Sequence, residues 1–311
     1  MSVLEDFKAF SASPDVSSAV AAIRALTRML QRSTASTMMS LVVEIRSAAD
    51  DLTSYGEYSI SLKAGCDLFL NDVTRTFDDG RDFESCKRAI VERGERFMEK
   101  AVESRETIAT HGERFIRDDA TILIHGHSRV VTQVLLNAAK SKTFNVIITE
   151  SRGVVGDGDG YVTAGILTKH SIPCTVILDS AVAYTMGKVD MCLVGASGVV
   201  ENGGIVNKVG TYQLAVVANA FRKPLYVAAE SYKFARLYPL NQDDLPSSKN
   251  QHAIVPCLDF GKSLQSENSE LLQMTSPTSD YTPPSYITLL FTDLGVLTTA
   301  AVSDELIKLY S

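Results

Sequence analysis

The stretch of sequence that decides the fold is ATILIHGHSRVVTQVLLNAAKSKTFNVIITE, residues 120–150. It begins and ends with a short run rich in Val and Ile, and the helix-like segment 129–140 lies between the two runs. Apolar runs that are continuous rather than alternating are typical of strands buried on both faces of a parallel sheet. The stretch therefore predicts a strand, a helix and a second strand parallel to the first.

Three more runs of the same kind follow, namely CTVILD at 174–179, MCLVGA at 191–196 and LYVAAE at 225–230. A second helix-like segment, 211–222, precedes the last of them. The apolar run YITLLFTDLGVL at 286–297 predicts one or two late strands, and 303–310 predicts a short closing helix. This alternation predicts a Rossmann-like, doubly wound parallel sheet for residues 119–311.

The residues before 119 carry helical periodicity instead. One amphipathic stripe consists of Met38, Leu41, Ile45, Ala48 and Leu52. Apolar residues recur at heptad-like spacing over 83–118 and predict one long helix, and Ser13 followed by Pro14 resembles a helix start. The predicted fold class is therefore α/β, with an N-terminal helical domain at 1–118 and a Rossmann-like domain at 119–311.

Composition and charge exclude several classes of function. Of the 311 residues 45% are hydrophobic, and 37 acidic side chains against 30 basic ones give a net charge of −7. Because no run of Lys or Arg occurs, we expect no nucleic-acid partner. No apolar stretch reaches the about 18 residues of a membrane span, and the start of the chain does not resemble a signal peptide, so we expect a cytosolic protein. Five cysteines without CxxC spacing predict neither a disulfide framework nor a zinc site, and we expect no metal and no cofactor.

Polar residues follow the predicted strands, at the edge where doubly wound sheets bind ligands. They are His125, His127, Ser128 and Arg129; Thr149, Glu150, Ser151 and Arg152; Asp179; Ser197; and Glu230 and Ser231. Glu150 is spaced like the ribose-binding acid of a nicotinamide enzyme, but the turn after His125 lacks the GxGxxG glycines. A structural role for the histidines is a second interpretation. No nucleophile elbow and no metal-binding spacing occurs.

A third interpretation is a phosphate site in VGASGVVENGGIVNKVGTY, residues 194–212. This segment runs from a strand through two glycines to Asn207 and Lys208 and then into a helix. Backbone N–H groups at a helix start bind anions, and the Lys208 ammonium would assist them. Ser128 and Arg129, at the start of another helix, form a second set of donors. The glycines are equally compatible with simple turns.

Four segments resemble the alpha subunits of eukaryotic translation initiation factor 2B, the guanine nucleotide exchange factor for initiation factor 2. They are SSAVAAIRALTRML (17–30), VGASGVVENGGIVNKVGTYQLAVVA (194–218), YVAAESYKFARLYPLNQDD (226–244) and DYTPPSYITLLFTDLGVLTTAAVSDELIKLY (280–310). The resemblance implies a non-catalytic regulatory subunit that forms a homodimer and joins beta, gamma, delta and epsilon subunits in a decamer. It also implies that the subunit senses the phosphorylated alpha subunit of initiation factor 2.

NGGIVNKVGT and DYTPP are also similar to segments of methylthioribose-1-phosphate isomerase and the ribose-1,5-bisphosphate isomerases. In these enzymes the motifs place a catalytic Cys after the first strand and a catalytic Asp after the VGA strand, and Gly126 and Ser197 stand there in this sequence. Neither residue is an acid or base near neutral pH, so we expect no enzyme activity. The alternative is an active sugar-phosphate aldose-ketose isomerase.

The resemblance thus predicts a vestigial pocket for a sugar phosphate. The residues expected to bind this ligand are His125, Ser128, Arg129, Thr149, Arg152, Asn207 and Lys208. Tyr238 and Tyr310, together with the helices of 15–118, are expected to contact the phosphorylated initiation factor, with core or dimer packing as the alternative for both tyrosines. The late apolar segment 287–297 is the expected homodimer interface.

Overall fold

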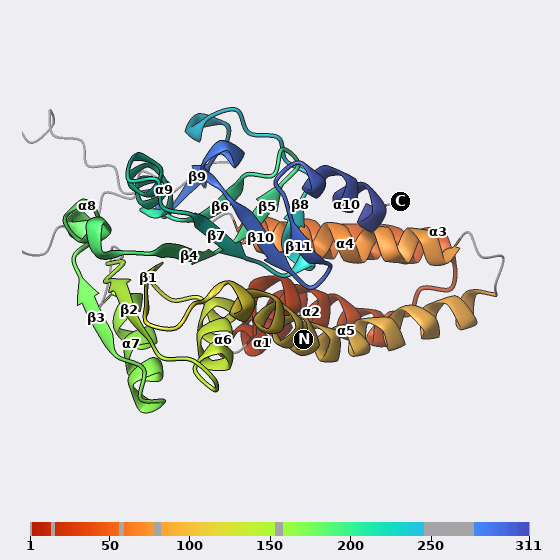
Figure 1. Ribbon diagram of the computed structural model, residues 1–311. Helices are drawn as coiled ribbons and strands as arrows, with labels where there is room; N and C mark the ends of the chain where they lie inside the picture. Colours follow the sequence, from red (N-terminus) through yellow and green to blue (C-terminus); the bar gives the residue numbers. More distant parts are fainter. Residues whose placement is uncertain are drawn as a thin grey trace, which may run out of the picture.

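A computed structural model describes residues 2–13, 16–55, 59–77, 82–152, 158–245 and 277–310. A group of N-terminal helices lies beside a region of strands and helices (Figure 1). The change of pattern occurs where the sequence predicts it, because a short 3-10 helix, Glu113–Phe115, is followed by the first strand at Ala120. The α/β fold class is therefore confirmed.

The N-terminal helices are α1 (Val3–Ser11), α2 (Ser18–Arg32), α3 (Met38–Ser54), α4 (Ile60–Phe77) and α5 (Phe83–Gly112). The stripe predicted on α3 is buried at Leu41, Ile45, Ala48 and Leu52. Helix α2 begins after its N-cap Ser17, whose hydroxyl accepts from the Val20 N–H, so the predicted start at Ser13 is wrong. Within the described ranges, no helix combines the length and the apolar character needed to cross a bilayer.

The main sheet has seven strands in the order β11-β10-β7-β4-β1-β2-β3. They are β1 (Ala120–His125), β2 (Phe144–Thr149), β3 (Cys174–Ile177), β4 (Met191–Gly195), β7 (Leu225–Ala228), β10 (Leu289–Thr292) and β11 (Gly295–Leu297). Neighbouring strands are parallel, except that β11 runs antiparallel to β10. Each predicted apolar run contains a strand, and the doubly wound parallel sheet is confirmed.

A second, four-stranded sheet has the order β8-β5-β6-β9 and was not expected from the sequence. Its strands are β5 (Gly198–Val200), β6 (Ile205–Lys208), β8 (Phe234–Ala235) and β9 (Ser279–Thr282). β5 follows β4 directly, and β8 comes shortly after β7, so this sheet extends the main sheet at the carboxyl ends of two central strands. It brings part of the segment that the sequence indicated as a phosphate site next to helix α4.

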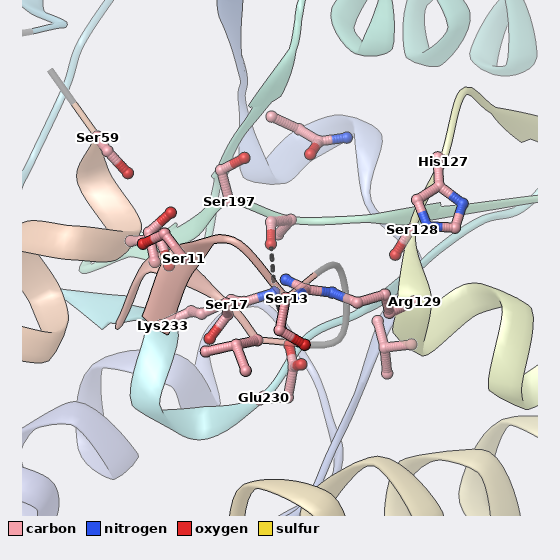
Figure 2. Close-up of a pocket in the computed structure, with 16 residues that line it drawn as sticks. Ser11, Ser13, Ser17, Ser59, His127, Ser128, Arg129, Ser197, Glu230 and Lys233 are labelled. Carbon is pink, nitrogen blue, oxygen red and sulfur yellow. Dashed lines mark hydrogen bonds and ion pairs between the residues drawn. The ribbon is translucent and has the colours of Figure 1, made fainter. Parts of the chain in front are cut away.

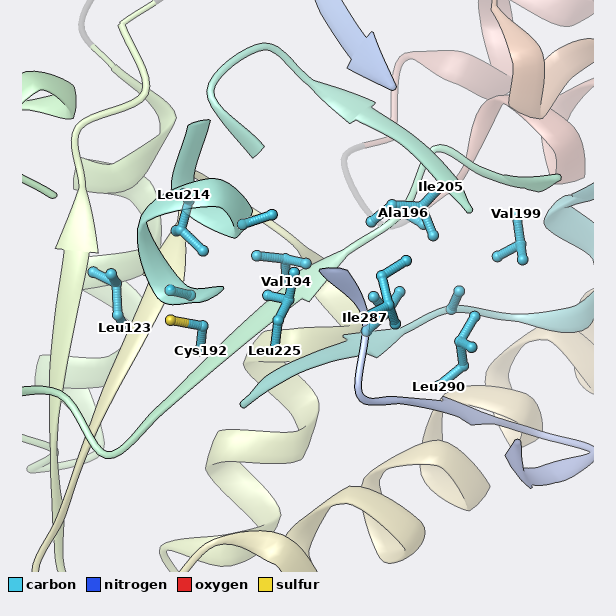
Figure 3. Close-up of a cluster of buried hydrophobic side chains, with 14 of the residues drawn as sticks. Leu123, Cys192, Val194, Ala196, Val199, Ile205, Leu214, Leu225, Ile287 and Leu290 are labelled. Carbon is cyan, nitrogen blue, oxygen red and sulfur yellow. The ribbon is translucent and has the colours of Figure 1, made fainter. Parts of the chain in front are cut away.

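The remaining helices cover the two faces of the main sheet. They are α6 (Arg129–Ala138), α7 (Asp159–Lys169), α8 (Val182–Thr185), α9 (Thr211–Ala220) and α10 (Ala301–Tyr310). Ile122 and Ile124 belong to a core to which α5, α6 and α7 contribute, whereas Leu123, between them, belongs to the core on the other face, to which α8, α9 and α10 contribute. Figure 3 shows the core on this second face, with Leu214 and Leu225 beside Cys192 and Val194. Burial on both faces explains the continuous apolar runs.

Helix α5 belongs to two cores. Its early residue Ile90 packs among α2, α3 and α4, whereas Ile108 and Ala109 pack against α6 and the main sheet. The division into domains at 118 and 119 therefore stays a prediction, because the helix before it serves both parts.

The late apolar segment 287–297 is partly buried. Ile287, Leu290 and Phe291 are at most 8% exposed, while Leu294 and Val296 are exposed. Strand β10 buries its apolar side chains on both faces of the sheet, so the exposed apolar surface of this segment is concentrated at Leu294 and Val296. The homodimer interface at 287–297 stays a prediction.

Candidate functional site

The winding of the main sheet reverses between β1 and β4, and doubly wound folds bind ligands at such a reversal. The segments after these two strands lie across from the starts of α2 and α4, and a cavity of about 430 Å³, the switch-point cavity, lies between them (Figure 2). It is lined by Ser11, Ser13, Val16, Ser17, Ser18, Ser59, Ser61, His127, Ser128, Arg129, Val130, Ala196, Ser197, Asn207, Glu230 and Lys233. Serine hydroxyls therefore dominate its wall.

Two helix N-termini meet at the switch-point cavity. Ser17 caps α2 and Ser128 caps α6, each through a hydrogen bond from a backbone N–H of the first turn. Neither helix has an acidic residue in its first turn, so no side chain of the helix itself neutralises the partial positive charge there. Ser61 is 7% exposed, lines the cavity, and has no hydrogen-bond partner for its hydroxyl among the described residues. The cavity is therefore suited to a small anion with several acceptor oxygens.

Arg129 and Lys233 add two cationic side chains to this cavity. Lys233 pairs with the Glu230 carboxylate at 2.7 Å and donates to the Ala196 carbonyl at 3.2 Å. Arg105, from α5, lies 3.5 Å from Glu230. Burial raises the pKa of Glu230, but the Lys233 ammonium, its hydrogen bond and Arg105 together outweigh burial and hold the pKa at about 2. Glu230 is thus ionised, and the cations around it exceed its charge.

A second cavity of about 320 Å³, the Lys208 cavity, adjoins the first. Four residues line both cavities, Ser59, His127, Ser197 and Asn207. Lys208 on β6 forms an ion pair with Asp159, the first residue of α7. One elongated molecule could therefore lie across both cavities and contact each set of polar groups.

Asp280 lies at the helix start that the sequence indicated as an anion site. Its carboxylate accepts from the backbone N–H of Gly210 at 2.7 Å and of Tyr212 at 3.0 Å, at the start of α9. Burial raises the pKa of Asp280 to about 6, although the two N–H groups act to lower it. The donors that the sequence assigned to an external anion are thus taken by a carboxylate of the chain itself.

His125 and Thr149 form part of the framework beneath the site. His125 Nε2 lies 2.9 Å from the Val209 carbonyl, which only accepts, so this nitrogen carries the proton. His125 Nδ1 then accepts from the Thr149 hydroxyl at 2.7 Å, and the same hydroxyl receives the Gly126 N–H. Burial lowers the pKa of His125, which favours this neutral form. Neither His125 nor Thr149 lines a cavity of the described site.

The other predicted ligand residues divide into two groups. Ser128, Arg129 and Asn207 line the switch-point cavity, and Lys208 lines the adjoining one. Arg152 lines neither cavity. Its side chain is 65% exposed and forms an ion pair with Glu150. The structure thus brings together four of the seven residues predicted for the ligand.

The two predicted partner-binding tyrosines differ in environment. Tyr238 is 61% exposed and close in sequence to Leu240, which is 77% exposed. Tyr310 packs at the edge of the core, where Arg236 lies 4.6 Å from its ring centre, and burial raises the pKa of Tyr310 to about 12. Tyr238 therefore has the more accessible side chain.

Gly126 and Ser197 lie at the ends of the two central strands, as predicted. Gly126 has φ +59°, and a Cβ added to it would lie 2.8 Å from the Ser151 side chain, so the backbone is shaped for glycine. Ser197 lines both cavities. No cysteine is among the described residues that line them, and no group of His, Cys, Asp and Glu in the described ranges could hold a metal ion.

Several residues of the site were missed as ligand candidates, among them the serines near the starts of α2 and α4. Lys233 and Ser61 line the switch-point cavity, and Asp159 holds Lys208. Lys233 lies only three residues after Glu230, which was selected because it ends a predicted strand. A search that included the next three residues after each strand would have found Lys233. Ser61 and Asp159 carry no comparable sequence pattern.

The chain is similar to known proteins both in sequence and in fold. The chain is 51% identical to the translation initiation factor eIF2B subunit alpha of Dictyostelium discoideum over 95% of its length and 92% of that protein. It is 31% identical to a ribose 1,5-bisphosphate isomerase of Methanocaldococcus jannaschii over 73% of its length and 71% of the enzyme. The fold matches a chain of the tetrameric eIF2B-beta2-delta2 complex from C. thermophilum with a TM-score of 0.78 at 16% identity, over 99% of this chain and 94% of that one.

The family model for the initiation factor 2 subunits matches residues 11–299, which include the switch-point cavity and both sheets. Together with the relative at 51% identity, this match confirms the resemblance found in the sequence motifs. The chain belongs to the initiation factor 2 subunit family.

Proposed function

We propose that this chain is a non-catalytic regulatory subunit of eIF2B and that its cleft binds a sugar phosphate as a ligand rather than a substrate. The observation that carries the proposal is the switch-point cavity, which has Arg129, Lys233 and two helix N-termini and is lined by Ser197. The resemblance to the isomerases implies that their acid-base pair would stand at Ser197 and at Gly126, directly after β1. A thiol placed at residue 126 would need both a left-handed backbone and a displaced Ser151. The similarity to the isomerases supports a sugar phosphate as the class of ligand.

Ribose 5-phosphate is expected to raise the melting temperature of the protein, because a ligand that binds only the folded state stabilises it. Arg129→Ala is expected to weaken this binding at least about tenfold, since a hydrogen-bonded charge pair contributes about 1.5–3 kcal/mol. Arg152→Ala removes the same charge outside both cavities and is expected to bind like the wild type. Thermal-shift titrations measure the binding of ribose 5-phosphate to the wild type and to both variants. An Arg129→Ala protein that binds like the wild type would contradict the proposed pocket.

The second candidate function, an active aldose-ketose isomerase, is favoured by His127 and Asp159, because an imidazole and a carboxyl group both line the Lys208 cavity. Incubation with ribose 1,5-bisphosphate decides between the two candidates. We expect no conversion to the ketose. Turnover above the buffer control would overturn the non-catalytic proposal.

The proposed partners are a second copy of the chain and the beta, gamma, delta and epsilon subunits. The name of a relative, eIF2B subunit alpha, and a solved complex of eIF2B beta and delta subunits support assembly with other eIF2B subunits. For phosphorylated initiation factor 2 alpha, Tyr238 is the stronger candidate contact because its side chain is exposed. Loss of capture of the phosphorylated protein by Tyr238→Ala, with retained melting temperature, supports this assignment. Unchanged capture removes it.

For the homodimer, exposed apolar side chains on α8, on α9 and directly after β3 are an alternative to the late apolar segment. Leu178, Tyr184 and Val216 are 58%, 87% and 39% exposed, and α8 and α9, which carry the last two, are in contact. Tyr184→Glu is expected to raise the dimer dissociation constant at least about tenfold, because a central aromatic side chain dominates such interfaces. Sedimentation velocity measures this, with Val102→Glu on α5 as the exposed control. Equal dissociation constants would locate the dimer interface elsewhere.

A further inference from the structure

Two histidines flank Gly126, and each lies beside the hydroxyl of a threonine. The Nδ1 atom of His125 lies 2.7 Å from the Thr149 hydroxyl, and the Nδ1 atom of His127 lies 2.9 Å from the Thr163 hydroxyl. Gly126 orients both hydroxyls, because its N–H donates to Thr149 at 3.3 Å and its carbonyl accepts from Thr163 at 3.0 Å. The proton of Thr149 is therefore left for His125, whereas the proton of Thr163 is already used.

This arrangement fixes the tautomer of His127. Because the Thr163 hydroxyl donates to a carbonyl, it can only accept from His127, so the Nδ1 atom of His127 carries a proton. Burial lowers the pKa of His127, and the charges of Arg129 and Lys208 act in the same direction. The Asp159 carboxylate opposes them, but the pKa remains below its ordinary value. His127 is therefore neutral near neutral pH, and its Nε2 atom is an acceptor without a proton.

The Nε2 atom of His127 is available to a ligand. His127 is half-buried and lines both the switch-point cavity and the Lys208 cavity (Figure 2). Within the described ranges, this nitrogen has no hydrogen-bond partner. A phosphate dianion has only acceptor oxygens, so it cannot share a hydrogen bond with an unprotonated nitrogen, whereas the hydroxyl group of a sugar can donate to it.

Resting on the proposed function, we propose that His127 determines the specificity of the site for sugar phosphates by accepting a hydrogen bond at Nε2 from a hydroxyl group of the sugar. The sugar then lies where His127 lines both cavities, and the phosphate lies away from Nε2. Recognition at this nitrogen depends on the hydroxyl donor and not on the charge of the ligand. A site that is built to bind a hydroxyl group discriminates against an analogue that lacks it.

Calorimetric titration at about pH 8 compares ribose 5-phosphate with cyclopentylmethyl phosphate, a dianion of similar size without hydroxyl groups. His127→Met removes the acceptor and is expected to lower the affinity for ribose 5-phosphate at least about fivefold. The loss for cyclopentylmethyl phosphate is expected to be smaller, because this ligand has no hydroxyl group to leave without a partner. His170→Met is the control and is expected to bind ribose 5-phosphate like the wild type, because His170 is exposed at the end of α7 and lines neither cavity.

Nitrogen-15 NMR of the wild type, with histidine signals assigned through bonds, tests the same hydrogen bond without any variant. We expect a proton on Nδ1 of His127 and none on Nε2, both in the free protein and in the complex with ribose 5-phosphate. A proton on Nε2 in the complex would overturn the assignment, and so would an equal loss of affinity for both ligands, or no loss, in His127→Met. The pocket would stand in each of these cases. If the wild type does not bind ribose 5-phosphate, the proposed function fails, and the role of His127 fails with it.

Discussion

Glu230→Ala is expected to lower the free energy of unfolding by about 3–5 kcal/mol, since removing one partner of a buried ion pair leaves the other charge uncompensated. Glu230 is 1% exposed and holds three groups, the Lys233 ammonium, the Arg105 guanidinium and the Tyr232 hydroxyl. Its folded pKa of about 2 lies below the ordinary value, so the stabilisation is present above the unfolded pKa and is lost as the pH falls through about 2. Urea unfolding at neutral pH measures the effect.

A control with the same geometry exists on α10. Lys308 and Glu305 are also three residues apart and also 2.7 Å apart, but the Lys308 side chain is 69% exposed. Glu305→Ala is therefore expected to change the free energy of unfolding by less than about 1 kcal/mol. Replacing both Glu230 and Lys233 by uncharged residues of similar size is expected to cost less than Glu230→Ala alone. Similar losses for Glu230→Ala and Glu305→Ala would show that burial does not set the strength of these pairs.

The main sheet was predictable because the apolar composition of each run indicates a strand without reference to distant residues. The central strands of the parallel part are covered on both faces, so apolar residues dominate them, and the run NVIITE indicates such a strand without knowledge of its neighbours. The edge strand β3 is only partly buried. The long helix 83–112 was predictable for a similar reason, since one stripe repeats over many turns.

The second sheet and helix α4 could not be predicted in this way. Strands β5 and β8 have three and two residues, which is too short for a periodic pattern. Helix α4 contacts α2, α3 and α5 and also β5, β8 and α10, so apolar residues occur around much of its circumference and no single stripe stands out. Both features depend on contacts between distant segments.

The candidate site also contains residues that local patterns predict and residues that depend on contacts between distant segments. Ser128 and Arg129 were found because a ligand edge follows from the strand order, which local patterns predict. The partner of Lys208 lies 49 residues before it, and the donors at the start of α9 are taken by Asp280, which is 70 residues from Gly210. A sequence can supply the right donors without revealing which of them the folded chain already uses.

The free energy of unfolding is expected to fall with rising pH because of Asp280, and Asp280→Asn is expected to lack this decrease. The folded pKa of Asp280, about 6, lies above its ordinary value of 3.8, so the folded state binds the proton more tightly than the unfolded state does. The stabilisation is fully present below the unfolded pKa and is lost as the pH rises through about 6. The whole change amounts to about 2–3 kcal/mol, of which about half falls between about pH 5 and about pH 7.5.

The measurement is the difference in unfolding free energy between Asp280→Asn and the wild type as a function of pH, since other titrating groups, His125 among them, contribute to both proteins. Asp118→Asn is the control. Hydrogen bonds from Thr143 lower the pKa of Asp118, so its titration lies below that of an ordinary Asp, and its difference from the wild type is expected to be flat over the same range. A flat difference for Asp280→Asn as well would mean that the Gly210 and Tyr212 N–H groups fully compensate the buried carboxylate. In that case the start of α9 would be a stronger anion site than the geometry implies.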